Sequence, residues 1–139
     1  MKKVCENMNV DGMNGAMLAF VGDAYYELKI REMLIKQGVN KTHRFHKLSV
    51  FYVSAKAQSK VLLTLIDQGF LTEQELEIIR RGRNVKTGTV PKNTDIMVYR
   101  YSTALEALVG YLYLKEEWSR LDELMSQVID IRNEDEENG

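Results

Sequence analysis

Apolar residues recur along the chain at the spacing of about 3.6 residues that an α-helix requires, and no comparable stretch alternates with the two-residue period of a strand. The first apolar stripe comprises Met13, Ala16, Met17, Phe20, Val21, Ala24 and Leu28. Two later stripes comprise Val61, Leu62, Leu65 and Ile66, and then Leu121, Leu124, Met125, Val128 and Ile129. The pattern predicts an all-α fold.

Short polar and glycine-containing segments separate the predicted helices. They fall at residues 37–40, at Gly69 and through residues 82–93. The third segment holds the single proline of the chain together with threonines and lysines, so residues 84–93 are expected to form the one substantial loop.

Two helix starts are marked by capping residues. Thr72 and Glu75 have the spacing of a capping box, in which each side chain bonds to the backbone N–H of the other residue. After the long loop, Asn93 or Thr94 is expected to cap a helix that runs to Leu114.

Composition bounds the class of protein. The chain of 139 residues is long enough for one domain, expected over residues 1–132, followed by an acidic disordered tail over residues 133–139. The lone Cys5 has no partner for a disulfide or a zinc site, which favours a reducing compartment. No segment resembles a signal peptide or reaches the roughly 20 apolar residues of a membrane span, so a cytoplasmic protein with no membrane partner is expected.

Two acidic residues stand alone in apolar helical segments. Asp23 lies in "LAFVGDAYYEL" and Glu106 lies in "ALEALVGYLYL". Each has a glycine nearby, Gly22 and Gly110, and a glycine within a helix costs roughly 1 kcal/mol relative to alanine, so a packing reason is expected. If the two helices cross closely at these glycines, the two acids meet.

Facing carboxylates cannot both ionise cheaply unless a cation lies between them. A hard divalent ion, Mg2+ first, accepts a site made only of oxygen ligands and completed by water or substrate phosphate. The alternative is that each acid pairs with an arginine or lysine, or that Glu106 lies on a solvated edge. Periodicity alone does not decide between these interpretations.

Basic residues gather in the second half of a chain whose net charge is only −1. Within one window, Asp95 is the single acid that opposes Arg80, Arg81, Arg83, Lys86, Lys92 and Arg100. A local basic strip favours phosphate binding more than the net charge of the whole chain does, although many such runs are ordinary solvated surface.

The sequence segments that contain the two acids resemble the catalytic domain of the ribonuclease III family. "LAFVGDA" is similar to the family's first motif and "EALVGYLYLK" to its second. Two further segments resemble the characteristic motifs of the short form of the family, Mini-ribonuclease III: "RRGRNVKTGTVPKNTD" and "YRYSTALEALVGYLYL". The resemblance spans residues 18–114 and implies the helical endonuclease fold of that family.

The resemblance implies that Asp23 and Glu106 are the catalytic acids and the metal ligands of a Mg2+-dependent endoribonuclease. The metal would activate water and offset charge on the scissile phosphodiester of double-stranded RNA, with no covalent protein nucleophile. Further family carboxylates fall on Ala16, Ala19 and Thr103, so fewer protein oxygens and more water are expected around one Mg2+ ion. Glu27 is a possible substitute ligand or an i,i+4 partner of Arg31, and Asp95 is expected to be a first-turn helix acid.

The short form implied by the resemblance lacks the family's separate RNA-binding domain, so the catalytic domain is expected to hold the duplex itself. The expected RNA-binding residues are Arg80, Arg81, Arg83, Asn84, Lys86 and Lys92. A second candidate region, residues 47–60, offers Lys56, Gln58 and Lys60. His43 and His46 are spaced for one helical face but have no third ligand nearby, so packing or a phosphate contact is favoured over a metal site.

The expected partners also follow from the resemblance. Family members are homodimers, and the tyrosines are expected to build the core and an aromatic subunit interface. The implied substrate is a precursor of large-subunit (23S) ribosomal RNA, with ribosomal proteins on the precursor particle as further partners.

Two alternative functions use the same residues differently. A catalytically inactive protein that binds duplex RNA is consistent with the absent carboxylates at Ala16, Ala19 and Thr103, but Asp23 and Glu106 are both present. A Mg2+-dependent nucleotide pyrophosphohydrolase would need several acids one turn apart around one site, and the alanines of the first motif disfavour it.

Overall fold

A computed structural model describes residues 8–86, 90, 92 and 95–138 of the chain. All regular secondary structure in these residues is helical, which confirms the predicted all-α fold. The helices are α1 (Gly15–Lys36), α2 (Thr42–Val53), α3 (Ala55–Asp67), α4 (Glu73–Arg83), α5 (Ile96–Leu114) and α6 (Trp118–Asn138). Cys5 lies outside the described residues.

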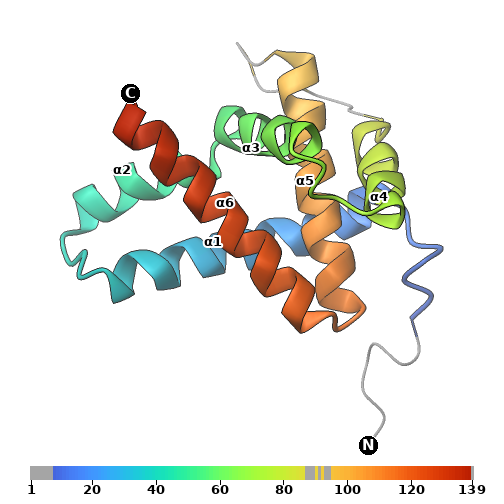
Figure 1. Ribbon diagram of the computed structural model, residues 1–139, viewed down its shortest axis with the longest axis horizontal. Helices are drawn as coiled ribbons and strands as arrows, with labels where there is room; N and C mark the ends of the chain where they lie inside the picture. Colours follow the sequence, from blue (N-terminus) through green and yellow to red (C-terminus); the bar gives the residue numbers. More distant parts are fainter. Residues whose placement is uncertain (1–7, 87–89, 91, 93–94, 139) are drawn as a thin grey trace, which may run out of the picture.

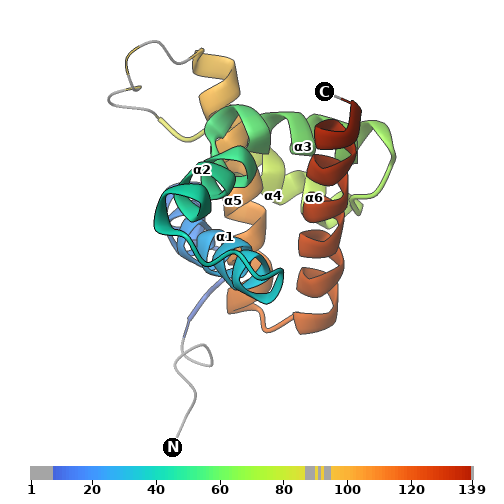
Figure 2. The same ribbon diagram turned by 90° about the vertical axis from the view of Figure 1, so that its left-hand side faces the viewer.

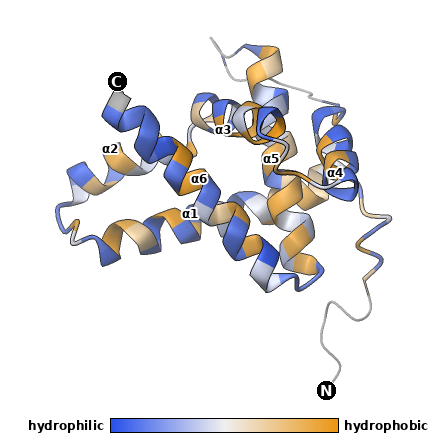
Figure 3. Cartoon of the chain, in the orientation of Figure 1, coloured by the Kyte–Doolittle hydropathy of each residue, from blue (hydrophilic) through white to orange (hydrophobic). Residues whose placement is uncertain are grey.

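Helix α5 is the centre of the fold. Helices α1, α3 and α4 pack against it from different sides, and α6 returns antiparallel to it (Figures 1 and 2). From Ala104 to Leu112 nearly every residue of α5 is buried, and Leu105 and Leu108 have no exposed surface. Figure 3 shows the apolar residues along this helix. A helix that is apolar on all sides is stable only when other helices surround it, and that explains the central position of α5.

Helices α1 and α5 cross in direct backbone contact. A Cβ atom added to Gly22 would overlap the backbone carbonyl of Glu106, and one added to Gly110 would overlap the carbonyl of Leu18. Only glycine at both positions permits this approach. The close crossing predicted from the sequence is confirmed, and it sets Asp23 against the middle of α5.

The buried face of α1 is not the face that the apolar stripe predicts. Met17, Phe20 and Leu28 are 53%, 77% and 52% exposed. The buried positions are Gly15, Leu18, Ala19, Gly22, Tyr26, Ile30 and Leu34. Both faces of this helix carry apolar residues. Periodicity therefore predicted the helix correctly, but the prediction of which face is buried was wrong.

The helix ends match the capping predictions in part. Thr72 and Glu75 form the predicted capping box at the start of α4. The residue that caps α5 is Asp95, whose Oδ1 accepts hydrogen bonds from the backbone N–H groups of Met97 and Val98 at 2.8 and 3.3 Å. This corrects the expected cap at Asn93 or Thr94, two residues that lie outside the described part of the chain.

The acidic C-terminal segment is helical. Helix α6 continues to Asn138, and its hydrophilic end is visible in Figure 3. Asp135 anchors this end because it lies 3.3 Å from Lys60 of α3 and 3.0 Å from Arg132. These contacts correct the expectation of a disordered tail from residue 133.

None of the helices in the described part of the chain combines the length and the apolar character that crossing a bilayer requires.

Candidate functional site

The two acids singled out in the sequence meet at the crossing of α1 and α5. The side chain of Glu106 is hydrogen-bonded to that of Asp23. Glu106 is partly buried, whereas Asp23 lies at the exposed edge of α1. The pair therefore opens to solvent on the side of Asp23, where a substrate can reach it.

The surroundings of Glu106 favour its neutral form. Burial first, and then the hydrogen bond and negative charge of Asp23, raise the pKa of Glu106 to about 9. The negative charge of Glu27 acts in the same direction, while a hydrogen bond from Gln58 opposes it. At neutral pH Glu106 therefore keeps its proton in the hydrogen bond with Asp23. Two acids joined by a single proton are a site that a divalent cation can occupy by displacing that proton.

Gln58 of α3 is the third polar side chain at this crossing. It is only 2% exposed, and its amide is hydrogen-bonded to Glu106. The expectation that Gln58 contacts RNA together with Lys56 and Lys60 is wrong for this residue, because the two lysines are exposed and Gln58 points inward. The feature of the sequence that could have identified Gln58 as an inward-facing residue is its place as an amide between the apolar residues Ala57 and Val61, which are both buried.

Glu27 and Tyr26 complete the surroundings of the acids. The carboxylate of Glu27 lies 3.0 Å from Arg31, which confirms the predicted i,i+4 pair. Tyr26 is fully buried and donates a hydrogen bond to the carbonyl of Tyr52 at 3.4 Å. Burial and the nearby Glu106 raise the pKa of Tyr26, so its hydroxyl stays protonated.

The positions where the family places further carboxylates supply none here. Ala16 is exposed, Ala19 is buried, and the hydroxyl of Thr103 donates to the carbonyl of Tyr99 at 3.0 Å within its own helix. Within the described ranges, no group of three His, Cys, Asp or Glu side chains is arranged to hold a metal, and this includes the exposed His43 and His46. The polar side chains at the crossing are two carboxylates and one amide, and the carboxylate oxygens are ligands of the kind that Mg2+ accepts.

The C-terminal end of α4 and the N-terminal end of α1 form a basic hollow of about 510 Å3. Its charged and amide side chains are Asn14, Arg80, Arg81, Asn84 and Lys86. The backbone N–H groups and the positive dipole end of α1 face the same region, which favours anions. Four of the six predicted RNA-binding residues therefore meet in one place.

Part of this positive charge is already neutralised. Arg80 is hydrogen-bonded to Glu77 at 3.0 Å, and the Nε atom of Arg81 lies 3.9 Å from a carboxylate oxygen of the same glutamate. Arg83 and Lys92 do not line the hollow, although Lys92 is exposed on the following loop. Residues 87–89, 91 and 93–94 of that loop lie outside the described part of the chain.

Arg100 of α5 has a buried polar atom without a partner. Its Nε atom is the one buried side-chain nitrogen or oxygen in the described residues that makes no hydrogen bond. An unpaired buried donor costs about 1–3 kcal/mol, and an anion that binds here would remove that cost.

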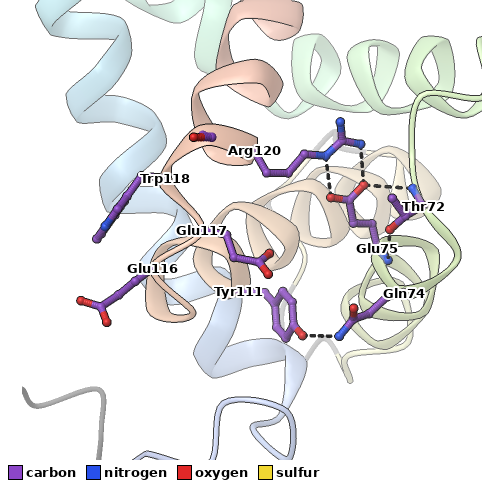
Figure 4. Close-up of a pocket in the computed structure, with 9 residues that line it drawn as sticks. Thr72, Gln74, Glu75, Tyr111, Glu116, Glu117, Trp118 and Arg120 are labelled. Carbon is purple, nitrogen blue, oxygen red and sulfur yellow. Dashed lines mark hydrogen bonds and ion pairs between the residues drawn. The ribbon is translucent and has the colours of Figure 1, made fainter.

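A hollow of about 550 Å3 lies between α4, α5 and α6 and does not include either acid. Its polar side chains bond to one another (Figure 4). Arg120 donates two hydrogen bonds to Glu75, at 2.8 and 2.7 Å, and Gln74 donates to Tyr111 at 2.6 Å. Burial would raise the pKa of Glu75, but the bonds from Arg120 and Thr72 lower it overall. This network fixes the three helices to one another.

An exposed apolar face lies on α1 beside Asp23. Phe20, Leu28, Tyr25 and Tyr113 line a hollow of about 420 Å3. The rings of Tyr25 and Tyr113 are 5.2 Å apart, and Trp118 packs edge-on against Tyr113 at 5.3 Å. Large apolar side chains gathered in this way mark an interaction surface.

Comparisons with known proteins match most of the chain. The model of the ribonuclease III domain matches residues 16–117. The Mini-ribonuclease 3 of Streptococcus pneumoniae is 43% identical over 122 residues, covering 88% of this chain and 95% of that protein. The Mini-ribonuclease 3 of Brevibacillus brevis is 48% identical over 118 residues, covering 85% and 87%. A crystal structure of a Fusobacterium nucleatum protein has a TM-score of 0.76 and 32% identity, covering 89% and 98%.

Proposed function

This chain belongs to the ribonuclease III family, and on that premise we propose that Asp23 and Glu106 are its catalytic acids and hold a Mg2+ ion. The family makes the chain an endoribonuclease that acts on double-stranded RNA. The observation that carries the assignment of the site is the hydrogen bond between these two acids, one from each of the two crossing helices.

The side chains prepare the site for a cation. Burial and Asp23 keep a proton on Glu106, and loss of that proton leaves two carboxylates facing the same point. Bound Mg2+ supplies the activation of water and the neutralisation of the charge that develops on the scissile phosphate. The rigid crossing at Gly22 and Gly110 fixes the distance between the two acids. The chain does not need to supply a covalent nucleophile.

A cleavage assay tests this function. The purified protein is incubated with a long RNA duplex in Mg2+, in EDTA, and in EDTA followed by excess Mg2+. We expect cleavage that is lost in EDTA and restored by Mg2+. If the protein binds the duplex but leaves it intact in every metal buffer, it is a catalytically inactive binding protein and the proposal fails.

We propose that the basic hollow contacts the phosphates of the duplex. A-form RNA is recognised mainly through its phosphates and 2′-hydroxyls, and Arg80, Asn84 and Lys86 present suitable donors. Four of the predicted RNA-binding residues line this one hollow, and their proximity supports the assignment.

Removing two charges from the hollow is expected to weaken RNA binding. For Arg80→Gln combined with Lys86→Gln, we expect duplex affinity to fall about tenfold and the salt dependence to decrease by about one to two counterions, because Glu77 already neutralises part of the Arg80 charge. The measurement is a binding titration at several salt concentrations in EDTA, where no cleavage occurs. Lys36→Gln combined with Lys41→Gln removes the same charge from exposed positions at the end of α1 and just before α2, and should leave both quantities unchanged. Equal effects of the two pairs would contradict a specific RNA surface.

We propose that the protein is a homodimer and that the apolar face of α1 is its interface. An exposed phenylalanine next to an aromatic-lined hollow is self-complementary, as a twofold interface requires. The face lies beside Asp23, so pairing through it would bring two catalytic sites to one duplex.

Phe20→Ser is expected to dissociate this dimer. Phe20 is 77% exposed and lines the hollow, so its loss removes a central apolar contact without disturbing the core of the protomer. Light scattering coupled to size-exclusion chromatography should give a dimer for the wild type and a monomer for the variant. Ile35→Ser, which changes an equally apolar residue of α1 that is 63% exposed and outside the hollow, should remain a dimer. A wild-type monomer at micromolar concentration would contradict the proposal.

We propose a precursor of large-subunit (23S) ribosomal RNA as the natural substrate, with ribosomal proteins of the precursor particle close to the enzyme. The similarity to Mini-ribonuclease 3 proteins supports this assignment. Mapping the RNA ends produced from naked precursor and from assembled particles tests it. Cleavage of unrelated duplexes as efficiently as the precursor would contradict it.

A further inference from the structure

The residue that this inference concerns is Gln58, at the point where α3 meets the crossing of α1 and α5. Its side chain is 2% exposed, while its neighbours Lys56 and Lys60 lie in solvent. Burying an amide costs free energy unless both of its polar atoms find partners. The rest of this face of α3 is apolar or small, with Ala57, Val61 and Leu62 fully or almost fully buried. Packing alone would therefore favour an apolar side chain at position 58.

The hydrogen bond of Gln58 to Glu106 has a defined direction. Gln58 lies on α3 and Glu106 on α5, and the two side chains are hydrogen-bonded where these helices pack together. A side-chain amide stabilises a carboxylate by donating from its NH2 group. When Glu106 is ionised, as metal binding requires, its oxygens can only accept hydrogen bonds, so the Nε2 atom of Gln58 is the donor.

We propose that Gln58 is a positioning residue for the catalytic site, whose amide holds the Glu106 carboxylate in the orientation that accepts a divalent cation together with Asp23. This inference rests on the proposed function of the two acids. It assigns each of three helices one part of the site: α1 carries Asp23, α5 carries Glu106 and α3 carries the amide. It also gives a physical reason why the site functions without carboxylates at Ala19 and Thr103, since a neutral donor fixes Glu106 without adding repulsion.

The substitution Gln58→Met tests the proposal because methionine has a similar length and volume but no amide. We expect kcat on duplex RNA to fall about 10- to 100-fold, the usual effect of removing a group that orients a metal ligand. Affinity for Mn2+, measured by calorimetry in the absence of RNA, should fall with it. KM and the affinity for duplex RNA in EDTA should be unchanged, because Gln58 is buried away from the RNA surface.

A structural role would give a different result. The control Ser59→Ala alters the neighbouring buried residue of α3, which is 5% exposed, and should leave kcat and Mn2+ affinity unchanged. Wild-type kcat and Mn2+ affinity in Gln58→Met would overturn the inference. The inference would also be overturned if the loss of activity in Gln58→Met disappeared once activity was expressed per folded molecule. If the wild-type protein itself fails to cut duplex RNA, the proposed function fails, which is a separate observation from any difference between wild type and variant.

Discussion

Glu106→Gln is expected to reduce kcat by about a thousandfold or more while making the metal-free protein more stable at neutral pH. Loss of a carboxylate that holds the metal removes several kcal/mol of transition-state stabilisation, and each 1.36 kcal/mol corresponds to about a factor of ten in rate. Affinity for duplex RNA in EDTA should not change, because the side chain is partly buried and the basic hollow is intact. Rapid-quench cleavage at saturating RNA and Mg2+ measures the effect.

The gain in stability follows from the direction of the pKa shift. The folded protein holds the pKa of Glu106 near 9, against 4.5 as its ordinary value. Below pH 4.5 the carboxyl is protonated in both the folded and the unfolded state and contributes no penalty. As the pH rises from 4.5 to 9, the unfolded state ionises first, so the free energy of unfolding decreases. Glutamine cannot ionise and avoids this loss.

Thermal melts at pH 4 and pH 7.5 in EDTA check this prediction. The difference in Tm between Glu106→Gln and wild type should be positive at pH 7.5 and close to zero at pH 4. Glu134→Gln makes the same chemical change at an exposed position of α6 and should alter neither Tm nor kcat. Full activity of Glu106→Gln would remove Glu106 from the catalytic site. If the wild-type protein were as stable as the variant at pH 7.5, burial of Glu106 would not lower the free energy of unfolding at that pH.

The relation between Asp23 and Glu106 could be predicted from the sequence because it depends on a local rule. Glycine is unfavourable within a helix, and a glycine beside each isolated acid indicated that two helices cross at those points. The resemblance of the surrounding words to a known family gave the chemistry. Neither argument needed the position of any other helix.

Other features depend on tertiary contacts that no local rule contains. Gln58 reaches Glu106 only because α3 packs against α5, and the sequence does not show that packing. The neighbouring Lys56 and Lys60 therefore suggested that Gln58 was exposed to solvent as well. Helix α1 has apolar residues on two faces, and only the packing decides that Phe20 is outside. The acidic end of α6 looked disordered because its partner Lys60 lies far away in the sequence.

The second large effect expected is a loss of stability in Gly22→Ala. The added methyl group would overlap backbone atoms of Glu106 and lie 2.8 Å from the backbone nitrogen of Gly110, and backbone atoms cannot move aside as a flexible side chain does. The two helices must then separate. Overpacking in a core costs about 1–3 kcal/mol and more where backbones must shift, and this exceeds the roughly 1 kcal/mol that alanine gains in a helix.

We therefore expect Gly22→Ala to lower the free energy of unfolding by about 3 kcal/mol and Tm by about 10 °C. Denaturant titration and thermal melts measure the change. Lys36→Arg enlarges an exposed side chain at the C-terminal end of α1, outside both hollows, and should have little effect. Activity per folded molecule should also fall in Gly22→Ala, because separating α1 from α5 moves Asp23 away from Glu106. A Gly22→Ala protein with wild-type Tm and wild-type kcat would show that the crossing does not set the geometry of the acids.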